Sequence, residues 1–394
     1  SFFVFSFKNA SADTATSSPE SDLLVQKVRI AQSLLNAINV DYKIYTVTGK
    51  YKGKKTFTKT LQRTVAVMGY NPGSQEIRPF IFKEDMAFNP RLRPTEKVPK
   101  VIASDTDCSL TWQGGNRWGF NKDMALQCNG QDYIVVGIKM PYTVSASSNQ
   151  VLVDSYVPYS DTLNTPATVA LGKQYLEKII SQAGQNLDAK NVMSHAFPDR
   201  KITEIVNPDF IMSLIVNEHM DHGQYLQAVK AGALPELVGK IWTIVGLNQE
   251  KAMKWSISSA GACCLTQFMP RTYTQVVKTY PEAQLDPKIS SGRQEHTNAV
   301  EASILLFDSD ISSWKEKTKL TCLSSTDMME KCLAVSYNGG PGTLNSVIKK
   351  FGYAWESGPI KTNKWIIGLR LETATYIQKL VSIKNYLVAT AKSL

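Results

Sequence analysis

Histidine is scarce in this chain, with four among 394 residues. The cysteines show no CxxC pair and no His/Cys cluster at the spacing of a zinc site. Ligands for Zn²⁺ normally come from such clusters. We therefore expect neither a metal nor any other cofactor.

A long apolar run is also missing. No stretch of roughly 18 apolar residues occurs, so no segment is expected to span a membrane by itself. No run of Lys and Arg interleaved with aromatic residues stands out either, and nucleic acid is not expected as a partner. The net charge of +10 favours another polyanion, such as an acidic cell-wall polymer, or is simply that of a soluble basic protein.

Six cysteines are present, an even number without metal spacing. This favours disulfides and an oxidising compartment, so we expect a periplasmic or extracellular protein, with buried reduced thiols as the alternative. Cys108 and Cys128 could close a loop of about twenty residues. The four cysteines near the C-terminus allow three pairings, among which the sequence does not choose.

Hydrophobic residues make up 43% of the chain and charged residues 20%, an ordinary globular mixture. The patterns predict an α+β multidomain protein, with a mostly β N-terminal domain followed by an all-α C-terminal domain. Residues 1–40 are interpreted as an N-terminal segment, a linker (8–22) and a helix (23–39). Short β-branched and aromatic runs separated by Gly, Pro, Asn and Ser predict the β domain at 41–160, with a binding or assembly role. Helical periodicity characterises residues 165–394.

Within that helical part, NPDFIMSLIVNE at residues 207–218 predicts a helix that ends in a carboxylate. Asn207 is a good N-cap and Pro208 suits the first helical position. Glu218 follows Leu214 and Ile211 by four and seven residues, so it lies on the apolar face of the helix. Partial burial would raise the pKa of this carboxyl, as a general acid near neutral pH requires. Alternatively, Glu218 is a helix-end residue that faces solvent.

Three later segments follow in order: SSAGACCLTQFMPRT at 258–272, LAVSYNGGPG at 333–342 and LETATYIQKL at 371–380. Together with the helix ending in Glu218, they resemble the four signatures of the soluble lytic transglycosylase family. The resemblance covers roughly residues 200–385. It implies a lysozyme-like fold and cleavage of the β-1,4 bond between N-acetylmuramic acid and N-acetylglucosamine in peptidoglycan, with formation of 1,6-anhydro-muramic acid.

The resemblance also implies roles for individual residues. Glu218 would be the single catalytic carboxylate, acting first as acid and then as base. The expected substrate-binding residues are Gln267, Tyr337, Asn338 and Glu372. Gln267 would line the sugar groove, the hydroxyl of Tyr337 would lie beside Glu218, and Glu372 would orient rather than react.

Three departures from the family pattern stand out. His219 replaces the usual Ser, and it could either titrate near neutral pH beside Glu218 or face solvent. Cys264, preceded by Cys263, stands where the family has Gly, and a disulfide between them could brace the groove. Residues 224–254 form an insertion with two helical patterns, which we expect to make a lid or a docking surface beside the cleft.

Two alternatives to a lytic transglycosylase remain open. A hydrolytic muramidase on the same fold would use water in place of the sugar's 6-hydroxyl group. A non-catalytic component of an envelope machine or virion would only bind the cell wall. In each case the expected partner is the peptidoglycan glycan strand, and the N-terminal domain is expected to bind other proteins of a virion or an envelope-spanning assembly.

Overall fold

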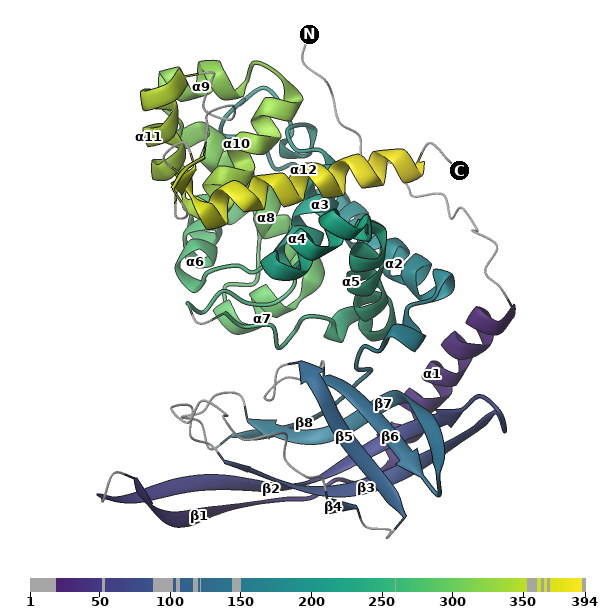
Figure 1. Cartoon of the computed structure of the whole chain (residues 1–394). Coiled ribbons are helices and arrows are strands. Elements are labelled where there is room, and N and C mark those ends of the chain that lie inside the picture. Colours follow the sequence, from purple (N-terminus) through teal and green to yellow (C-terminus); the bar gives the residue numbers. More distant parts are fainter. Residues whose placement is uncertain are drawn as a thin grey trace. The chain divides into compact units, whose positions relative to one another are not determined.

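The chain forms two compact units in the computed structural model (Figure 1). Thr14–Gly172 and Gly246–Lys251 make up the sheet unit, and Lys173–Val245 and Ala252–Leu394 belong to the helical unit. The division falls inside two helices, α2 (Pro166–Ala189) and α5 (Leu234–Asn248). The structure describes residues 19–51, 54–87, 102–103, 107–115, 120, 122–143, 150–258, 260–352, 360–362, 365–366 and 369–391.

The predicted N-terminal segment and most of the predicted linker, residues 1–18, lie outside the described residues. The predicted helix is present as α1 (Pro19–Ala37) and begins four residues earlier than expected. Strands follow as β1 (Tyr42–Tyr51), β2 (Lys54–Asn71), β3 (Glu76–Ala87), β4 (Ile102–Ala103), β5 (Cys108–Gly115), β6 (Lys122–Cys128), β7 (Gln131–Thr143) and β8 (Val151–Tyr156).

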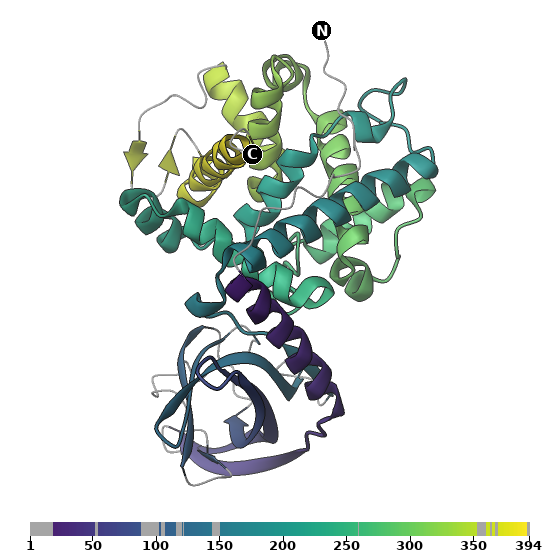
Figure 2. The same ribbon diagram turned by 90° about the vertical axis from the view of Figure 1, so that its right-hand side faces the viewer.

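These strands form one antiparallel sheet, whose curl is visible in Figure 2. Their order is β4-β3-β2-β7-β6-β5, with β1 also paired to β2 and β8 also paired to β7. The mostly β character predicted for the N-terminal part is therefore confirmed. Cys108 and Cys128 lie opposite each other in β5 and β6 and form a disulfide, as their spacing indicated.

The core of the sheet unit lies where α1 packs against the sheet. Leu24, Val28 and Leu35 are buried and fall at helical spacing, so they share one face of α1. Gly137 of β7 permits this close approach, because a Cβ atom there would lie 2.7 Å from Cδ1 of Leu35. Other members of the core alternate along β2, as the two-residue period of a strand requires: Ala66, Met68 and Tyr70.

A buried ion pair crosses the sheet between β2 and β3. Arg63 and Glu84 face each other in the register and are 1% and 3% exposed. Both Nε and Nη2 of Arg63 donate to Oε2 of Glu84, at 2.9 and 2.6 Å, and Nη1 donates to the carbonyl of Pro141 at 2.7 Å. The guanidinium thus holds three strands together through its fork of donors.

Helices make up most of the helical unit. Besides parts of α2 and α5, its helices are α3 (Pro208–Glu218), α4 (His222–Ala231), α6 (Pro270–Thr279), α7 (Ile289–Gln294), α8 (His296–Ser313), α9 (Glu316–Cys322), α10 (Thr326–Gly339), α11 (Pro341–Phe351) and α12 (Leu371–Ala391). Short 3₁₀ turns occur at Asp161–Leu163, Ile202–Glu204, Gln249–Lys251 and Pro281–Ala283.

The expectation of an all-α C-terminal domain is wrong in one segment. Three short strands, β9 (Ile360–Thr362), β10 (Trp365–Ile366) and β11 (Leu369–Arg370), form a small antiparallel sheet before α12. The helical part predicted for residues 165–394 is interrupted here, and α12 begins at Leu371. Strands of two or three residues are too short to show the alternation that marks a strand in a sequence.

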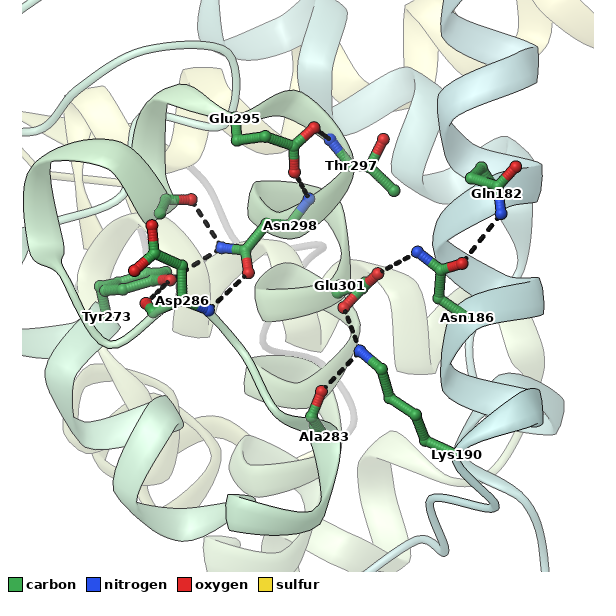
Figure 3. Close-up of polar contacts among 11 residues, drawn as sticks. Gln182, Asn186, Lys190, Tyr273, Ala283, Asp286, Glu295, Thr297, Asn298 and Glu301 are labelled. Atoms are coloured by element: carbon green, nitrogen blue, oxygen red, sulfur yellow. Dashed lines mark hydrogen bonds and ion pairs between the residues drawn. The ribbon is translucent and has the colours of Figure 1, made fainter.

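Polar side chains fix the start of α8, which lies inside the helical unit (Figure 3). Glu295 caps the helix by accepting hydrogen bonds from the backbone amides of Thr297 and Asn298, at 3.1 and 2.6 Å. One turn later, buried Glu301 accepts from Asn186 of α2 at 2.6 Å and from Lys190, the residue after α2, at 3.2 Å. Asn298 and Glu301 are thus part of the scaffold of the helical unit.

We expect Arg63→Met to lower the free energy of unfolding by about 3–5 kcal/mol, because the carboxylate of Glu84 would stay buried without its partner. Urea unfolding of the full chain, followed by circular dichroism, measures this change. The double variant Arg63→Met/Glu84→Leu should regain most of the loss. Wild-type stability in the single variant would show that the pair contributes nothing.

Candidate active site

Helix α3 carries Glu218 as its last residue. The side chain of Asn207 accepts a hydrogen bond from the amide of Asp209 at 3.0 Å, and Pro208 occupies the first turn, so the helix begins as the sequence predicts. Every residue from Phe210 to Asn217 is buried. The helix therefore runs through the core and ends with Glu218 half-buried.

A pocket of about 490 Å³ opens at the end of α3. It is lined by residues of α3, α4, α10 and α12, namely Asn217, Glu218, His222, Asn338, Glu372, Thr375, Tyr376 and Lys379. Three of the five predicted site residues, Glu218, Asn338 and Glu372, thus share one pocket. Tyr337 and Gln267 are not among the residues that line it.

The carboxyl of Glu218 is tuned by its neighbours. Tyr376 donates a hydrogen bond to Oε1 of Glu218 at 2.5 Å. Burial raises the pKa of Glu218 to about 7, against the hydrogen bond from Tyr376 and the charge of Lys379, which lower it, while the charge of Glu372 raises it further. A carboxyl with such a pKa can both give and accept a proton near neutral pH.

Tyr337 lies behind the pocket and connects two of the motif segments. Its hydroxyl donates to the carbonyl of Thr266, and its ring packs against Phe268 and Phe307, with centroids 6.2 and 5.7 Å away. Burial, together with the charge of Glu218, raises the pKa of Tyr337 well above its usual value, so the phenol stays neutral. The tyrosine hydroxyl bonded to Glu218 is that of Tyr376.

Asn338 and Thr373 connect the third and fourth motif segments. The hydroxyl of Thr373 donates to Oδ1 of Asn338 at 2.8 Å. This bond fixes the amide of Asn338 at the pocket wall and places the end of α10 against the start of α12. Glu372, next to Thr373, is exposed at the pocket.

Gln267 is not among the residues that line the pocket, and its side chain instead forms hydrogen bonds to backbone carbonyls. Its side-chain amide donates to the carbonyls of Ser256 and Cys264, at 2.9 and 2.8 Å. A disulfide joins Cys263 and Cys264 in the same loop. Cys264 has a φ of 72°, a left-handed conformation that favours glycine, which is the residue the family pattern has at this position.

His219 is half-buried, and it does not titrate near neutral pH. Its Nε2 donates to the carbonyl of Leu265 at 2.8 Å, and burial lowers its pKa to about 4. His219 is therefore a neutral link between the end of α3 and the loop that holds Thr266 and Gln267.

Several pocket residues were quoted in the sequence motifs or lay beside them without a predicted role. These are Thr375, Tyr376 and Lys379, which follow Glu372, a residue with a predicted role, by three, four and seven residues. Such spacing places them along one face of a helix. That signal was available in the sequence, but only the packing of α12 on α3 shows that the face meets Glu218.

The predicted insertion at 224–254 contains the larger part of α4 and all of α5. The side chain of Asp221 accepts a hydrogen bond from the amide of Gln224 at 2.9 Å and so caps α4. His222, the first residue of α4, lines the pocket. The inserted segment therefore begins beside the pocket.

The remaining cysteines near the C-terminus, Cys322 and Cys332, form a third disulfide. Within the described ranges, no group of three His, Cys, Asp or Glu side chains is arranged to hold a metal ion. None of the described helices is long and apolar enough to cross a lipid bilayer.

No family model, no curated protein and no solved structure matches the chain.

We expect Glu218→Gln to become more stable relative to the wild type as the pH rises. Folding raises the pKa of Glu218 from its ordinary value of 4.5 to about 7. The folded state then binds the proton more tightly, so this contribution to stability is complete below 4.5 and is lost as the pH rises through 7. The difference between pH 5 and pH 8 should be on the order of 1–3 kcal/mol in urea unfolding. Parallel pH dependences of the two proteins would contradict the raised pKa.

Proposed function

We propose that the chain is a peptidoglycan lytic transglycosylase with Glu218 as its catalytic acid and base. The observation that supports this most is that the four motif segments form one hydrogen-bonded site. Tyr376 of the fourth segment donates to Glu218 of the first, and Tyr337 of the third donates to Thr266 of the second. Thr373 and Asn338 connect the fourth segment to the third.

In the proposed reaction, protonated Glu218 gives its proton to the glycosidic oxygen between N-acetylmuramic acid and N-acetylglucosamine, and the bond from the muramic acid's anomeric carbon to that oxygen breaks. The substrate's own N-acetyl group stabilises the positive charge that develops on the anomeric carbon. The carboxylate of Glu218 then takes the proton of the 6-hydroxyl group of the same muramic acid, whose oxygen bonds to the anomeric carbon. Glu218 is protonated again, and no water is consumed.

This cycle needs a carboxyl that changes protonation twice, and a pKa of about 7 suits both steps. The neighbouring phenols stay neutral, because burial raises the pKa of Tyr376 as well as that of Tyr337. Both can therefore serve as hydrogen-bond donors without adding negative charge. Glu372, which is exposed, would orient the substrate or Glu218 instead of reacting.

We further propose that the sheet unit attaches this activity to other proteins of a virion or an envelope-spanning assembly, outside the cytoplasm. Three disulfides suit an oxidising compartment. A net charge of +10 suits a protein that works on an acidic wall.

We expect Glu218→Gln to lower the rate of peptidoglycan digestion by roughly 10²–10⁴-fold, because the amide cannot donate the proton that cleaves the bond. Purified peptidoglycan is digested with each protein, and the muropeptides are identified by mass spectrometry. Wild-type products should end in 1,6-anhydro-muramic acid. Glu236→Gln, at an exposed position on α5, is the matched control and should leave the rate unchanged.

Two other outcomes would replace this proposal. Products with reducing ends, heavier by one water, would assign the protein as a hydrolytic muramidase. Peptidoglycan that binds to the wild type without being cleaved would assign it as a wall-binding structural component.

A further inference from the structure

Lys379 lies on α12, is 8% exposed and lines the pocket. Its ammonium group is buried at the C-terminal end of α3, the helix that carries Glu218. Its Nζ donates to the carbonyls of Asn217 at 3.0 Å and Met220 at 2.7 Å. These carbonyls belong to the residues on either side of Glu218 and His219, so one side chain fixes the backbone around the carboxylate.

The end of α3 is a favourable place for a cation. The last carbonyls of a helix lack partners within the helix and carry its negative dipole end. A second contact strengthens the link, since Nδ2 of Asn217 donates to the carbonyl of Tyr376 at 3.0 Å. Lys379 also lies over the ring of Tyr376, 5.8 Å from its centroid. Tyr376, which donates to Glu218, and Lys379, which fixes the backbone around Glu218, are therefore packed together.

Burial lowers the pKa of Lys379, against the charges of Glu218, Asp221 and Glu372, which raise it. Both of its hydrogen bonds go to neutral carbonyls, and no carboxylate in the described part of the chain forms an ion pair with it. A buried ammonium costs free energy unless it is paired, so its presence here calls for a reason. Its field acts on Glu218, where it favours the carboxylate and so opposes the effect of burial on the pKa.

We propose that Lys379 is a positioning residue that fixes the end of α3 and moves the range in which Glu218 exchanges protons to lower pH. This inference rests on the proposed function, because it assigns a role to Lys379 in the same site. The other titratable groups around Glu218 are His219 beside it, Asp221 and His222 at the start of α4, Tyr337 on α10, and Glu372 and Tyr376 on α12. Of these and Lys379, Lys379 is the buried basic group that donates to the backbone on either side of Glu218 and His219.

The test compares Lys379→Met with Lys379→Arg. Loss of the cation should raise the pKa of Glu218, so the basic limb of the pH profile of kcat/KM on peptidoglycan should move to higher pH by roughly one unit. Lys379→Arg keeps the charge and should keep the wild-type profile. Carbon-13 NMR of protein labelled at glutamate carboxyls, with the Glu218 signal assigned by its loss in Glu218→Gln, should show the same shift in the titration midpoint without any need for activity.

Lys384→Met is the matched control for the loss of an anchoring lysine on α12. Lys384 bonds to buried Glu330 on α10 and lies outside the pocket lining. This variant should lose thermal stability, while the midpoint of the NMR titration of the Glu218 carboxyl should equal that of the wild type. A stability loss in Lys379→Met with no movement of either the pH profile or the NMR midpoint would overturn the proposal.

The failure of this inference can be distinguished from the failure of the proposed function. If Glu218→Gln abolishes cleavage but Lys379→Met titrates like the wild type, the function stands and the role of Lys379 is refuted. If Glu218→Gln cleaves normally, the proposed function fails, while the NMR midpoint still reports whether Lys379 acts on Glu218.

Discussion

The packing of α12 on α3 determines the chemistry of the pocket, because it surrounds Glu218 with protein and leaves its carboxyl at the pocket surface. Burial alone favours the protonated acid, whereas the phenol of Tyr376 and the ammonium of Lys379 favour the carboxylate. These opposing effects leave a carboxyl that titrates near neutral pH. Without α12, Glu218 would be an ordinary residue at the end of a helix.

Asp308 is another buried carboxylate of the helical unit, and its environment differs from that of Glu218. Asp308 accepts hydrogen bonds from Ser194, from the backbone amides of His195 and Ala196, and from Tyr280. Within the described residues, Glu218 receives one side-chain hydrogen bond, from Tyr376. Asp308 is thus saturated with donors, as suits a carboxylate that supports the fold, whereas the carboxyl of Glu218 keeps a side open to the pocket.

Local sequence signals were sufficient for part of this structure. The cap at Asn207 and Pro208 and the apolar period of α3 predicted where that helix begins and where it ends. Short β-branched and aromatic runs separated by turn residues predicted the mostly β domain. The role of Tyr376 was not predictable, since it depends on how two helices separated by more than 150 residues pack together. Gln267 was expected at the groove. Its side-chain amide instead donates to the backbone carbonyls of Ser256 and Cys264, and the residue type alone does not reveal this.

We propose that the pocket at the end of α3 holds a glycosidic bond against Glu218. A crystal structure of Glu218→Gln with a bound peptidoglycan glycan fragment tests this most directly. We predict that the side chain of residue 218 lies within hydrogen-bonding distance of the glycosidic oxygen, with Asn338 and Glu372 in contact with the flanking sugars. A fragment bound at another surface, with this pocket free of sugar, would contradict the account.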